Sequence, residues 1–343
     1  MNAEASPLPD SWLRAVVHIG PMKTGTTALA ISLAASTRSG RLAPDLVYPI
    51  DELWASEGNP VAKHHSITSL ARAGSAPPEI QRTLDERRDG AVRRLDNLSR
   101  VLRSRGDGQC SVFFIAEGAT YRVDPVELTD QLLTWFDEVT YCLVARGQVP
   151  GIESSLSHAV RKSVPRDVNS ASRPVNIKAV HERRFDYSRI VSRWSSLARA
   201  RLIVVPFLEG DIATYALFDR LFTEIGLPLA PREEVVDGRR VHSAISVGAE
   251  RKLRLLAAFH RHLSWNPALQ RIVGTRFARV RARALRRSRH HGAADRRTRL
   301  SARKAEAVRS DYAQSNAEFK AFLGDAALEP PWVEWFAAQQ PAH

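Results

Sequence analysis

The stretch AVVHIGPMKTGTTALAISLAA, residues 15–35, decides the fold of this chain. A short apolar, β-branched run at 15–19 precedes a glycine-rich turn, and an apolar helical pattern follows over 26–37. In a strand-turn-helix connection of this kind, backbone N–H groups and the positive end of the helix dipole face an anion. Residues 20–27 are therefore predicted to hold a phosphate-like group.

The position of the lysine in this loop indicates what kind of anion it holds. In triphosphate-binding loops of the form GxxxxGKS or GxxxxGKT, the lysine follows the last glycine and reaches the β and γ phosphates. Here Gly20 and Gly25 keep that spacing, but Lys23 lies between them and Thr26 and Thr27 follow. This placement favours a terminal anionic group that is not part of a metal-bridged triphosphate.

Further apolar runs predict the rest of the sheet. Runs that are short and continuously apolar are typical of strands buried on both faces of a parallel sheet, and helical patterns lie between them. The predicted strands after the first are 111–116, 140–145 and 201–207, and the predicted helices after the loop helix are 79–105, 126–137, 152–162, 187–199 and 211–225. The alternation predicts a doubly wound α/β sheet, and the chain beyond Gly226 is predicted to be helical.

Length and composition favour one enlarged domain. The chain has 343 residues and no linker rich in Pro, Gly and Ser, so a single domain over 11–343 is predicted. We find neither a signal-like start nor an apolar run of about 18 residues, which predicts a soluble, cytoplasmic protein. Cys110 and Cys142 lie in apolar runs, which favours buried thiols over a disulfide or a metal site.

The net charge of +13 is concentrated in one segment. Thirteen Lys and Arg residues lie between Arg271 and Lys304 with a single acid, Asp295, so the rest of the chain is nearly neutral. Within this segment Val273, Phe277 and Val280 recur at helical spacing, which predicts a basic amphipathic helix within 266–305. Either its apolar stripe docks on the domain and the arginines face solvent, or arginines such as Arg279, Arg283, Arg286 and Arg287 bind an anionic acceptor or the anionic surface of the inner membrane. No nucleic acid is expected as a partner.

The loop HIGPMKTGTTALA resembles the 5′-phosphosulfate-binding loop of sulfotransferases, especially bacterial ones with the pattern HIGxxKTGTT. The resemblance implies a P-loop-NTPase-like fold and 3′-phosphoadenosine 5′-phosphosulfate (PAPS) as co-substrate, without a metal. It also implies that Lys23 binds the bridging oxygen and the sulfuryl group. Thr24, Gly25, Thr26 and Thr27 would then bind the 5′-phosphate.

A second motif supports the resemblance. Members of the family hold the 3′-phosphate with an arginine that ends a later strand and a serine eight residues further on. In TYCLVARGQVPGIESSLSHAV, Arg146 ends an apolar run and Ser154 follows at that distance, with Ser155 beside it as an alternative. A guanidinium forks onto phosphate oxygens and a hydroxyl adds a neutral donor, so the pairing suits a phosphate.

Later stretches extend the resemblance to about Gly324. FDYSRIVSRWSSLARARLIVVPF and SNAEFKAFLG are similar to the family's sequence in these places, and Tyr187, Trp194 and Phe319 are predicted to be packing residues. The basic glycine loop with which cytosolic sulfotransferases complete the 3′-phosphate site has no counterpart that we find.

Several residues are candidates for the general base that the acceptor hydroxyl requires. Glu117 ends the predicted strand SVFFIAEG, where ligand-facing residues of an open α/β sheet lie, and is the first choice. His65, beside His64, is the second, and the Asp51 and Glu52 pair is the third.

The predicted activity is transfer of a sulfuryl group from PAPS to a hydroxyl acceptor, for which the bacterial relatives suggest a carbohydrate or a glycolipid. One alternative is a P-loop kinase or NTPase, because VFFIAE is also compatible with a strand that ends in a magnesium-binding acid. Another is a polyanion-binding module that uses the arginine-rich segment.

Overall fold

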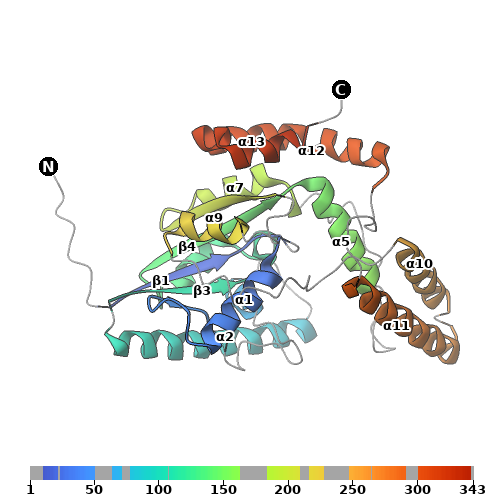
Figure 1. The fold of residues 1–343 in the computed structure, drawn as a ribbon. Coiled ribbons are helices and arrows are strands. Elements are labelled where there is room, and N and C mark those ends of the chain that lie inside the picture. Colours follow the sequence, from blue (N-terminus) through green and yellow to red (C-terminus); the bar gives the residue numbers. More distant parts are fainter. Residues whose placement is uncertain are drawn as a thin grey trace. The chain divides into compact units, whose positions relative to one another are not determined.

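A computed structural model of the chain describes residues 11–21, 24–50, 64–71, 78–106, 108–162, 184–208, 216–227, 247–263, 265–290 and 300–340. The elements follow the chain in the order of Figure 1. They are β1 (Ser11–His18), α1 (Thr26–Arg38), β2 (Leu46–Val47), the 3-10 helix η1 (His65–Ser69), α2 (Pro78–Arg105), β3 (Gly108–Ile115), α3 (Ala119–Arg122), α4 (Pro125–Leu132), β4 (Glu138–Arg146), α5 (Gln148–Lys162), α7 (Tyr187–Ser195), β5 (Ala200–Phe207), α9 (Ala216–Ile225), α10 (Val247–His262), α11 (Pro267–His290), α12 (Ala302–Leu323), the 3-10 helix η4 (Gly324–Leu328) and α13 (Pro330–Ala337).

A five-stranded sheet in the order β2-β3-β1-β4-β5 organises the fold. Each pair of neighbouring strands is parallel, and β1 is the central strand, with His18 opposite Ile115 of β3 and Cys142 of β4. The glycine loop leaves the end of this central strand and leads directly into α1. The sheet confirms the predicted P-loop-NTPase-like, doubly wound fold, and it adds the two-residue strand β2, which has no counterpart among the predicted runs.

One face of the sheet packs against α1 and α9. Inward side chains of every second strand residue, such as Val16, Phe113 and Cys142, form one hydrophobic cluster with Leu29 of α1 and Leu221 of α9. Because a strand exposes alternate residues to opposite faces, this cluster occupies one side of the sheet only.

The opposite face packs against other elements. Tyr141 of β4 meets Trp194 of α7 edge to face at 4.6 Å between ring centroids. Phe114 of β3 meets His64, which precedes η1, and Phe136, which follows α4. The strands are thus covered on both faces, which explains their continuously apolar sequences.

Several helices differ from their predicted limits, and the helix predicted at 187–199 ends at Ser195. The helix predicted at 152–162 begins at Gln148, because Pro150 lies in its first turn, where backbone N–H groups have no partner within the helix. The helix predicted at 126–137 ends at Leu132. The next residues turn so that the Asp137 carboxylate accepts a hydrogen bond from Leu13 N–H at 2.8 Å, at the start of β1.

The chain is divided into two compact units. The first comprises the described parts of Met1–Arg146, Tyr187–Asp237 and Ser315–Trp335, and the second those of Gly147–Asp186, Gly238–Gln314 and Phe336–His343. The first holds the sheet, together with a cluster in which Phe319 packs on Tyr187, Trp332 and Trp335. These ring contacts confirm packing roles for Tyr187, Trp194 and Phe319. The single domain over 11–343 stays a prediction.

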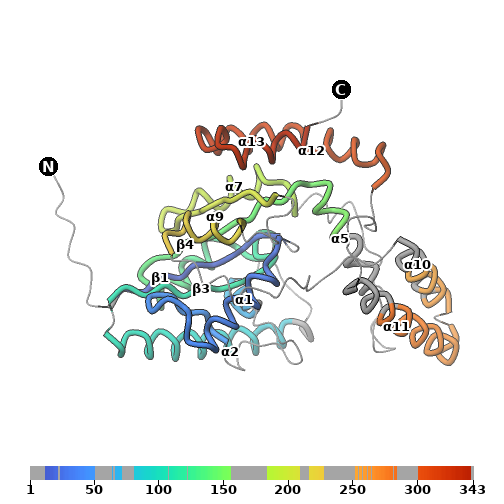
Figure 2. Tube along the Cα trace, in the orientation of Figure 1, coloured from blue at the N-terminus to red at the C-terminus, as the bar shows by residue number. Residues whose placement is uncertain are grey.

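The second unit is helical where it is described. Helices α10 and α11 lie side by side as a hairpin (Figure 2), and α10 also contacts α5. All regular elements described after Leu227 are helices, as predicted. The arginine-rich segment forms α11 over Pro267–His290.

Candidate nucleotide-binding site

Gly20 is in the loop that follows β1, and it lies between β3 and β4, the two strands that flank β1 in the sheet. On one side its carbonyl oxygen accepts a hydrogen bond from Gly118 N–H at 3.1 Å, just past the end of β3. On the other side, a β-carbon added at Gly20 would lie 3.4 Å from the backbone nitrogen of Val144 in β4 and 2.9 Å from the His18 ring. A side chain at Gly20 would therefore force the buried His18 ring to shift. The loop therefore begins where the carboxyl ends of β3 and β4 meet, the usual ligand position of such sheets.

The end of the loop forms the N-terminus of α1. Gly25 has φ of 79°, a conformation that favours glycine, and its carbonyl accepts hydrogen bonds from Ala28 and Leu29 N–H. Gly25 is the N-cap residue of α1 and has no side chain that could cap this helix end. The first N–H groups of a helix have no partner within it, so this end offers an anion both hydrogen-bond donors and the positive end of the helix dipole.

The three threonines of the loop differ in their surroundings. Thr24 is buried, and its hydroxyl donates a hydrogen bond to the Pro21 carbonyl at 3.0 Å, which stabilises the turn. Thr26 is also buried, and Thr27 is half-buried at the start of α1. The hydroxyl proton of Thr24 is thus used within the loop, so its remaining donor is the backbone N–H.

Glu117 lies directly beside the loop. It follows the end of β3 and precedes Gly118, whose φ is 81° and whose N–H binds Gly20. The residue is buried, at 7% exposure. Its carboxylate is close enough to Tyr48 to contribute, after desolvation by burial, to raising the pKa of that phenol. A buried carboxylate therefore lies at the strand end where the sequence predicts one.

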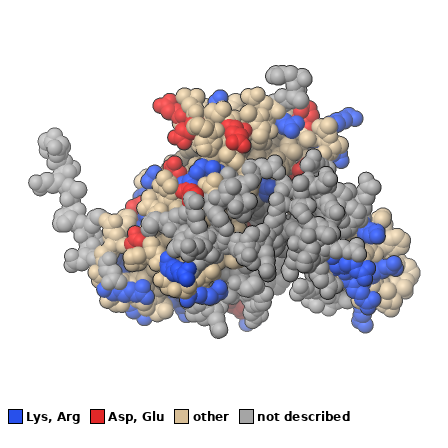
Figure 3. Space-filling view, viewed as in Figure 1, with Lys and Arg blue, Asp and Glu red and all other residues tan. Residues whose placement is uncertain are grey.

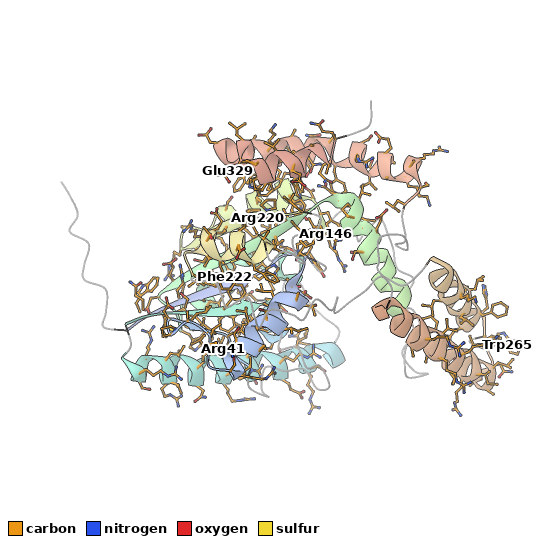
Figure 4. All side chains as sticks on the ribbon, viewed as in Figure 1. Arg41, Arg146, Arg220, Phe222, Trp265 and Glu329 are labelled. Carbon is orange, nitrogen blue, oxygen red and sulfur yellow. The ribbon has the colours of Figure 1, made fainter. Side chains whose placement is uncertain are left out.

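The backbone of Arg146 is held at the end of β4. The Tyr187 hydroxyl accepts a hydrogen bond from Arg146 N–H and donates one to the Arg146 carbonyl, both at 2.8 Å. The guanidinium carbon lies 5.0 Å from the centre of the Phe207 ring, in β5. Arg146 is two residues past Val144, which lies beside Gly20, so a cation lies at the same edge of the sheet as the loop (Figure 4).

Several predicted site residues are not placed by the structure. Lys23, Asp51 and Glu52 lie outside the described residues. His65 begins η1, but the position of its side chain is likewise outside the description. Ser154 and Ser155 are half-buried in α5, which belongs to the second unit. The pairing of Ser154 with Arg146, which belongs to the first unit, therefore stays a prediction.

His64, the neighbour of the second base candidate, has a structural role. Its backbone N–H donates to the Ile115 carbonyl, and its ring Nδ1 accepts a hydrogen bond from Ile115 N–H at 3.0 Å. Its Nε2 lies 2.9 Å from the Pro49 carbonyl, which can only accept, so Nε2 carries the proton. The His64 ring thus links the last residue of β3, Ile115, to Pro49 in the chain that follows β2.

Three residues of the site were missed by sequence reasoning. His18 is fully buried and packs against Gly20, and Tyr187 anchors Arg146 in addition to its packing role. Thr120 is buried, with its N–H directed to the Ile19 carbonyl, and its hydroxyl has no hydrogen-bond partner among the described residues. Only His18 had a signal, its position just before the glycine loop, because the others come into place through long-range contacts.

Metal and membrane features were sought in the described residues. They contain no group of three or more His, Cys, Asp or Glu side chains that could hold a metal ion. None of the described helices is long and apolar enough to cross a membrane. Cys142 is buried, which raises the pKa of its thiol, and Cys110 is half-buried.

Comparisons with known proteins add a fold likeness. No protein-family model and no curated protein matches the sequence. A crystal structure of a sulfotransferase from Alicyclobacillus acidocaldarius is similar over 75% of this chain and 95% of that chain, with 16% identity and a TM-score of 0.39. The sulfotransferase domain from the curacin biosynthetic pathway is similar over 69% of this chain and 80% of that domain, with 14% identity and a TM-score of 0.35. Both are sulfotransferases, the family that the sequence motifs resemble, but values this low carry no conclusion about activity.

Proposed function

We propose that this chain is a sulfotransferase that moves a sulfuryl group from PAPS to the hydroxyl of an acceptor, a carbohydrate or a glycolipid. The observation that carries the proposal is the edge of the sheet around Gly20. There an uncapped helix N-terminus, a buried carboxylate and an arginine at a strand end come from three consecutive strands of the sheet, β3, β1 and β4. Anion-binding groups and a proton acceptor are both needed for transfer from a phosphosulfate.

The donor is proposed to bind through its two phosphate groups. The N–H groups of Thr24, Gly25, Thr26 and Thr27, with the Thr26 and Thr27 hydroxyls, bind the 5′-phosphate at the start of α1. The Arg146 guanidinium binds the 3′-phosphate, with Ser154 as its partner donor. The two hydrogen bonds from Tyr187 to the Arg146 backbone support this role, because they fix the position from which the guanidinium extends.

Lys23 is proposed to stabilise the leaving group. During transfer the bond between sulfur and the bridging phosphate oxygen breaks, a bond between sulfur and the acceptor oxygen forms, and negative charge develops on the leaving phosphate. A cation directed at that oxygen lowers the barrier because the interaction strengthens in the transition state. The position of Lys23 inside the glycine loop supports this role.

Glu117 is proposed to take the proton of the acceptor hydroxyl. Its position beside the loop, at the end of β3, supports this choice, because a general base must lie close to the hydroxyl whose proton it takes. His65 and the Asp51 and Glu52 pair are the alternatives. The products are the sulfated acceptor, adenosine 3′,5′-bisphosphate and a proton first held by the base.

A P-loop kinase or NTPase is the second candidate, because Glu117 at the end of β3 also suits a magnesium-binding acid. Calorimetric titration separates the two. Adenosine 3′,5′-bisphosphate binding in EDTA, without binding of ATP in magnesium, supports the sulfotransferase. The reverse result supports the kinase and overturns the proposal.

The acceptor is identified by transfer of labelled sulfate from PAPS to a cell extract, with analysis of the labelled product. Label in a carbohydrate or glycolipid fraction that depends on Lys23 supports the full proposal. Label in peptide tyrosine or in a small phenol keeps the sulfotransferase activity and overturns the acceptor.

A further inference from the structure

The α10–α11 hairpin carries large apolar side chains on its outer surface. They are Leu255 and Phe259 of α10, Trp265 of the turn, and Leu269 and Ile272 of α11, exposed by 64%, 63%, 74%, 41% and 63%. We call these five residues the apolar tip. Trp265 lies at the turn end of the hairpin (Figure 4). Clustered apolar side chains of this size are uncommon on a water-facing surface unless they bind something.

The apolar tip does not hold the hairpin together. The two helices contact each other, and the large apolar side chains that they bury are others, Phe277 of α11 and Leu253 of α10, at 1% and 0% exposure. The predicted stripe of α11 is thus on the inner side, with Val273 and Val280 half-buried. The arginines predicted to lie away from the stripe, Arg279 and Arg283, are exposed.

The exposed side of α11 changes character along its length. Ile272, Arg276, Arg279 and Arg283 follow one another at spacings of four, three and four residues, so they share one side of the helix. Of these four residues, the one nearest the turn is apolar and the other three are basic, and Arg271, beside Ile272, is exposed as well. Lys252 of α10 is exposed at the end of that helix away from the turn. We call Lys252, Arg276, Arg279 and Arg283 the basic collar, and Figure 3 shows Lys and Arg side chains gathered on this hairpin.

The charge of the hairpin excludes some partners. The sequence from Arg251 to His290 contains twelve Lys and Arg residues and no Asp or Glu. A second copy of the same surface would carry the same charge and repel it. A nucleic acid or another hydrated polyanion would bind the basic collar but would leave the apolar tip exposed to water.

We propose that the α10–α11 hairpin inserts its apolar tip into the surface of an anionic lipid bilayer, with the basic collar at the level of the lipid phosphates. Interfacial segments bury apolar side chains roughly 5–10 Å deep, while Lys and Arg remain at the head groups. From Ile272 to Arg276 the helix rises roughly 6 Å, which matches that change of environment. Trp is also favoured at the boundary between head groups and acyl chains. The tip and the collar share no residue with the Gly20 loop, and the test of this proposal does not depend on the sulfotransferase activity.

Co-sedimentation of the full chain with vesicles tests the proposal. We compare phosphatidylcholine vesicles with vesicles that also contain phosphatidylglycerol, at low and high salt. Binding is expected only to the anionic vesicles, and it should weaken as salt screens the collar. Equal binding to neutral vesicles, or no binding to either, overturns the proposal.

Two sets of variants separate the tip from the collar. Phe259→Ser, Trp265→Ser and Ile272→Ser together should lower the partition coefficient by at least about a hundredfold, because exposed apolar surface loses its contact with lipid. Arg276→Gln, Arg279→Gln and Arg283→Gln together should also lower it by about a hundredfold. Matched controls are Leu328→Ser with Val333→Ser, and Arg87→Gln, Arg93→Gln and Arg100→Gln in α2, all at exposed positions, and these should bind like the parent.

The combined result decides which partner the hairpin has. Loss of binding with the collar variants but not with the tip variants identifies a purely electrostatic polyanion site and overturns membrane insertion. A concentration-dependent dimer in sedimentation velocity that the tip variants abolish would show that a second copy covers the tip, which also overturns membrane insertion.

Brominated acyl chains should quench Trp fluorescence in the parent and much less in Trp265→Phe. Equal quenching of both proteins would place Trp265 outside the bilayer and would overturn the proposal.

Discussion

The Gly20 loop and the α10–α11 hairpin present their functional groups in opposite ways. At the loop, backbone groups and a few buried side chains are held by contacts with neighbouring strands, such as the bond between Gly118 and Gly20. On the hairpin, exposed side chains project from two helices that bury other apolar residues. Single substitutions at the loop should therefore have large, specific effects on chemistry. Single substitutions on the outer surface of the hairpin should have small, additive effects on membrane binding, and these effects should depend on salt.

The largest effect is expected for Lys23→Ala. Loss of one charge-stabilising group in an active site costs about a hundredfold to a thousandfold in kcat, because the interaction is made mainly in the transition state. Lys304→Ala, which removes an exposed lysine of α12, is the control and should keep full turnover. Single-turnover assays with labelled PAPS measure both, and a Lys23→Ala enzyme with most of its turnover would contradict the mechanism.

The next effect is expected for Glu117→Gln. Turnover should fall by about a hundredfold or more, the scale of general-base loss, while affinity for adenosine 3′,5′-bisphosphate is kept. Glu127→Gln, at an exposed position in α4, is the control. If His65→Ala has this effect and Glu117→Gln does not, His65 is the base.

Within the hairpin, two phenylalanines separate folding from function. Phe277→Ala should destabilise the hairpin by about 3 kcal/mol, because it leaves a cavity between the helices. Phe259→Ala removes the same side chain from an exposed position and should change stability by less than about 0.5 kcal/mol. Hydrogen exchange of the α10 and α11 amides measures both. Equal destabilisation would mean that Phe259 is buried in solution and would weaken the membrane proposal.

A moderate effect is expected for Arg146→Ala. Donor affinity should fall about tenfold to a hundredfold with kcat largely kept, since the lost hydrogen bonds go to a phosphate remote from the reaction. Arg199→Ala, an exposed arginine before β5, is the control. Tyr187→Phe loses both hydrogen bonds to the Arg146 backbone and should weaken donor binding in the same direction but less. Calorimetric titration with adenosine 3′,5′-bisphosphate gives the affinities, and an unchanged affinity of Arg146→Ala would exclude it from the donor site.

The smallest effect is expected for Thr120→Val. The Thr120 hydroxyl is buried without a hydrogen-bond partner among the described residues, so an apolar side chain of the same shape should raise stability by about 1 kcal/mol. Urea unfolding at constant pH measures the change, and Thr129→Val, whose hydroxyl is hydrogen-bonded to Pro125 and Tyr141, should lower stability instead. A loss of stability in Thr120→Val would show that its hydroxyl has a partner in solution.

Much of the fold could be predicted from the sequence because the patterns are local. The loop helix, β3, β4 and β5 were all indicated by apolar runs and by the glycine spacing. The strand β2 could not be predicted, because two residues, Leu46 and Val47, have no periodicity and are defined by pairing with β3. The early start of α5 was missed because Pro150 reads as a helix boundary, although the first helical turn tolerates it.

The features of the candidate site also separate into those that local sequence predicts and those that only the tertiary structure defines. Glycine spacing and local sequence pattern alone predicted an anion loop at Gly20 to Thr27, the acid after β3, the arginine at the end of β4 and the basic amphipathic helix, because each depends on residues within one or two turns of chain. Only the tertiary structure decided that Glu117, Gly20 and Arg146 share one edge of the sheet, that Tyr187 holds Arg146, that His64 links Ile115 to Pro49, and that the hairpin has an apolar tip. These depend on strand register and helix packing between residues far apart in the chain, which no local pattern encodes.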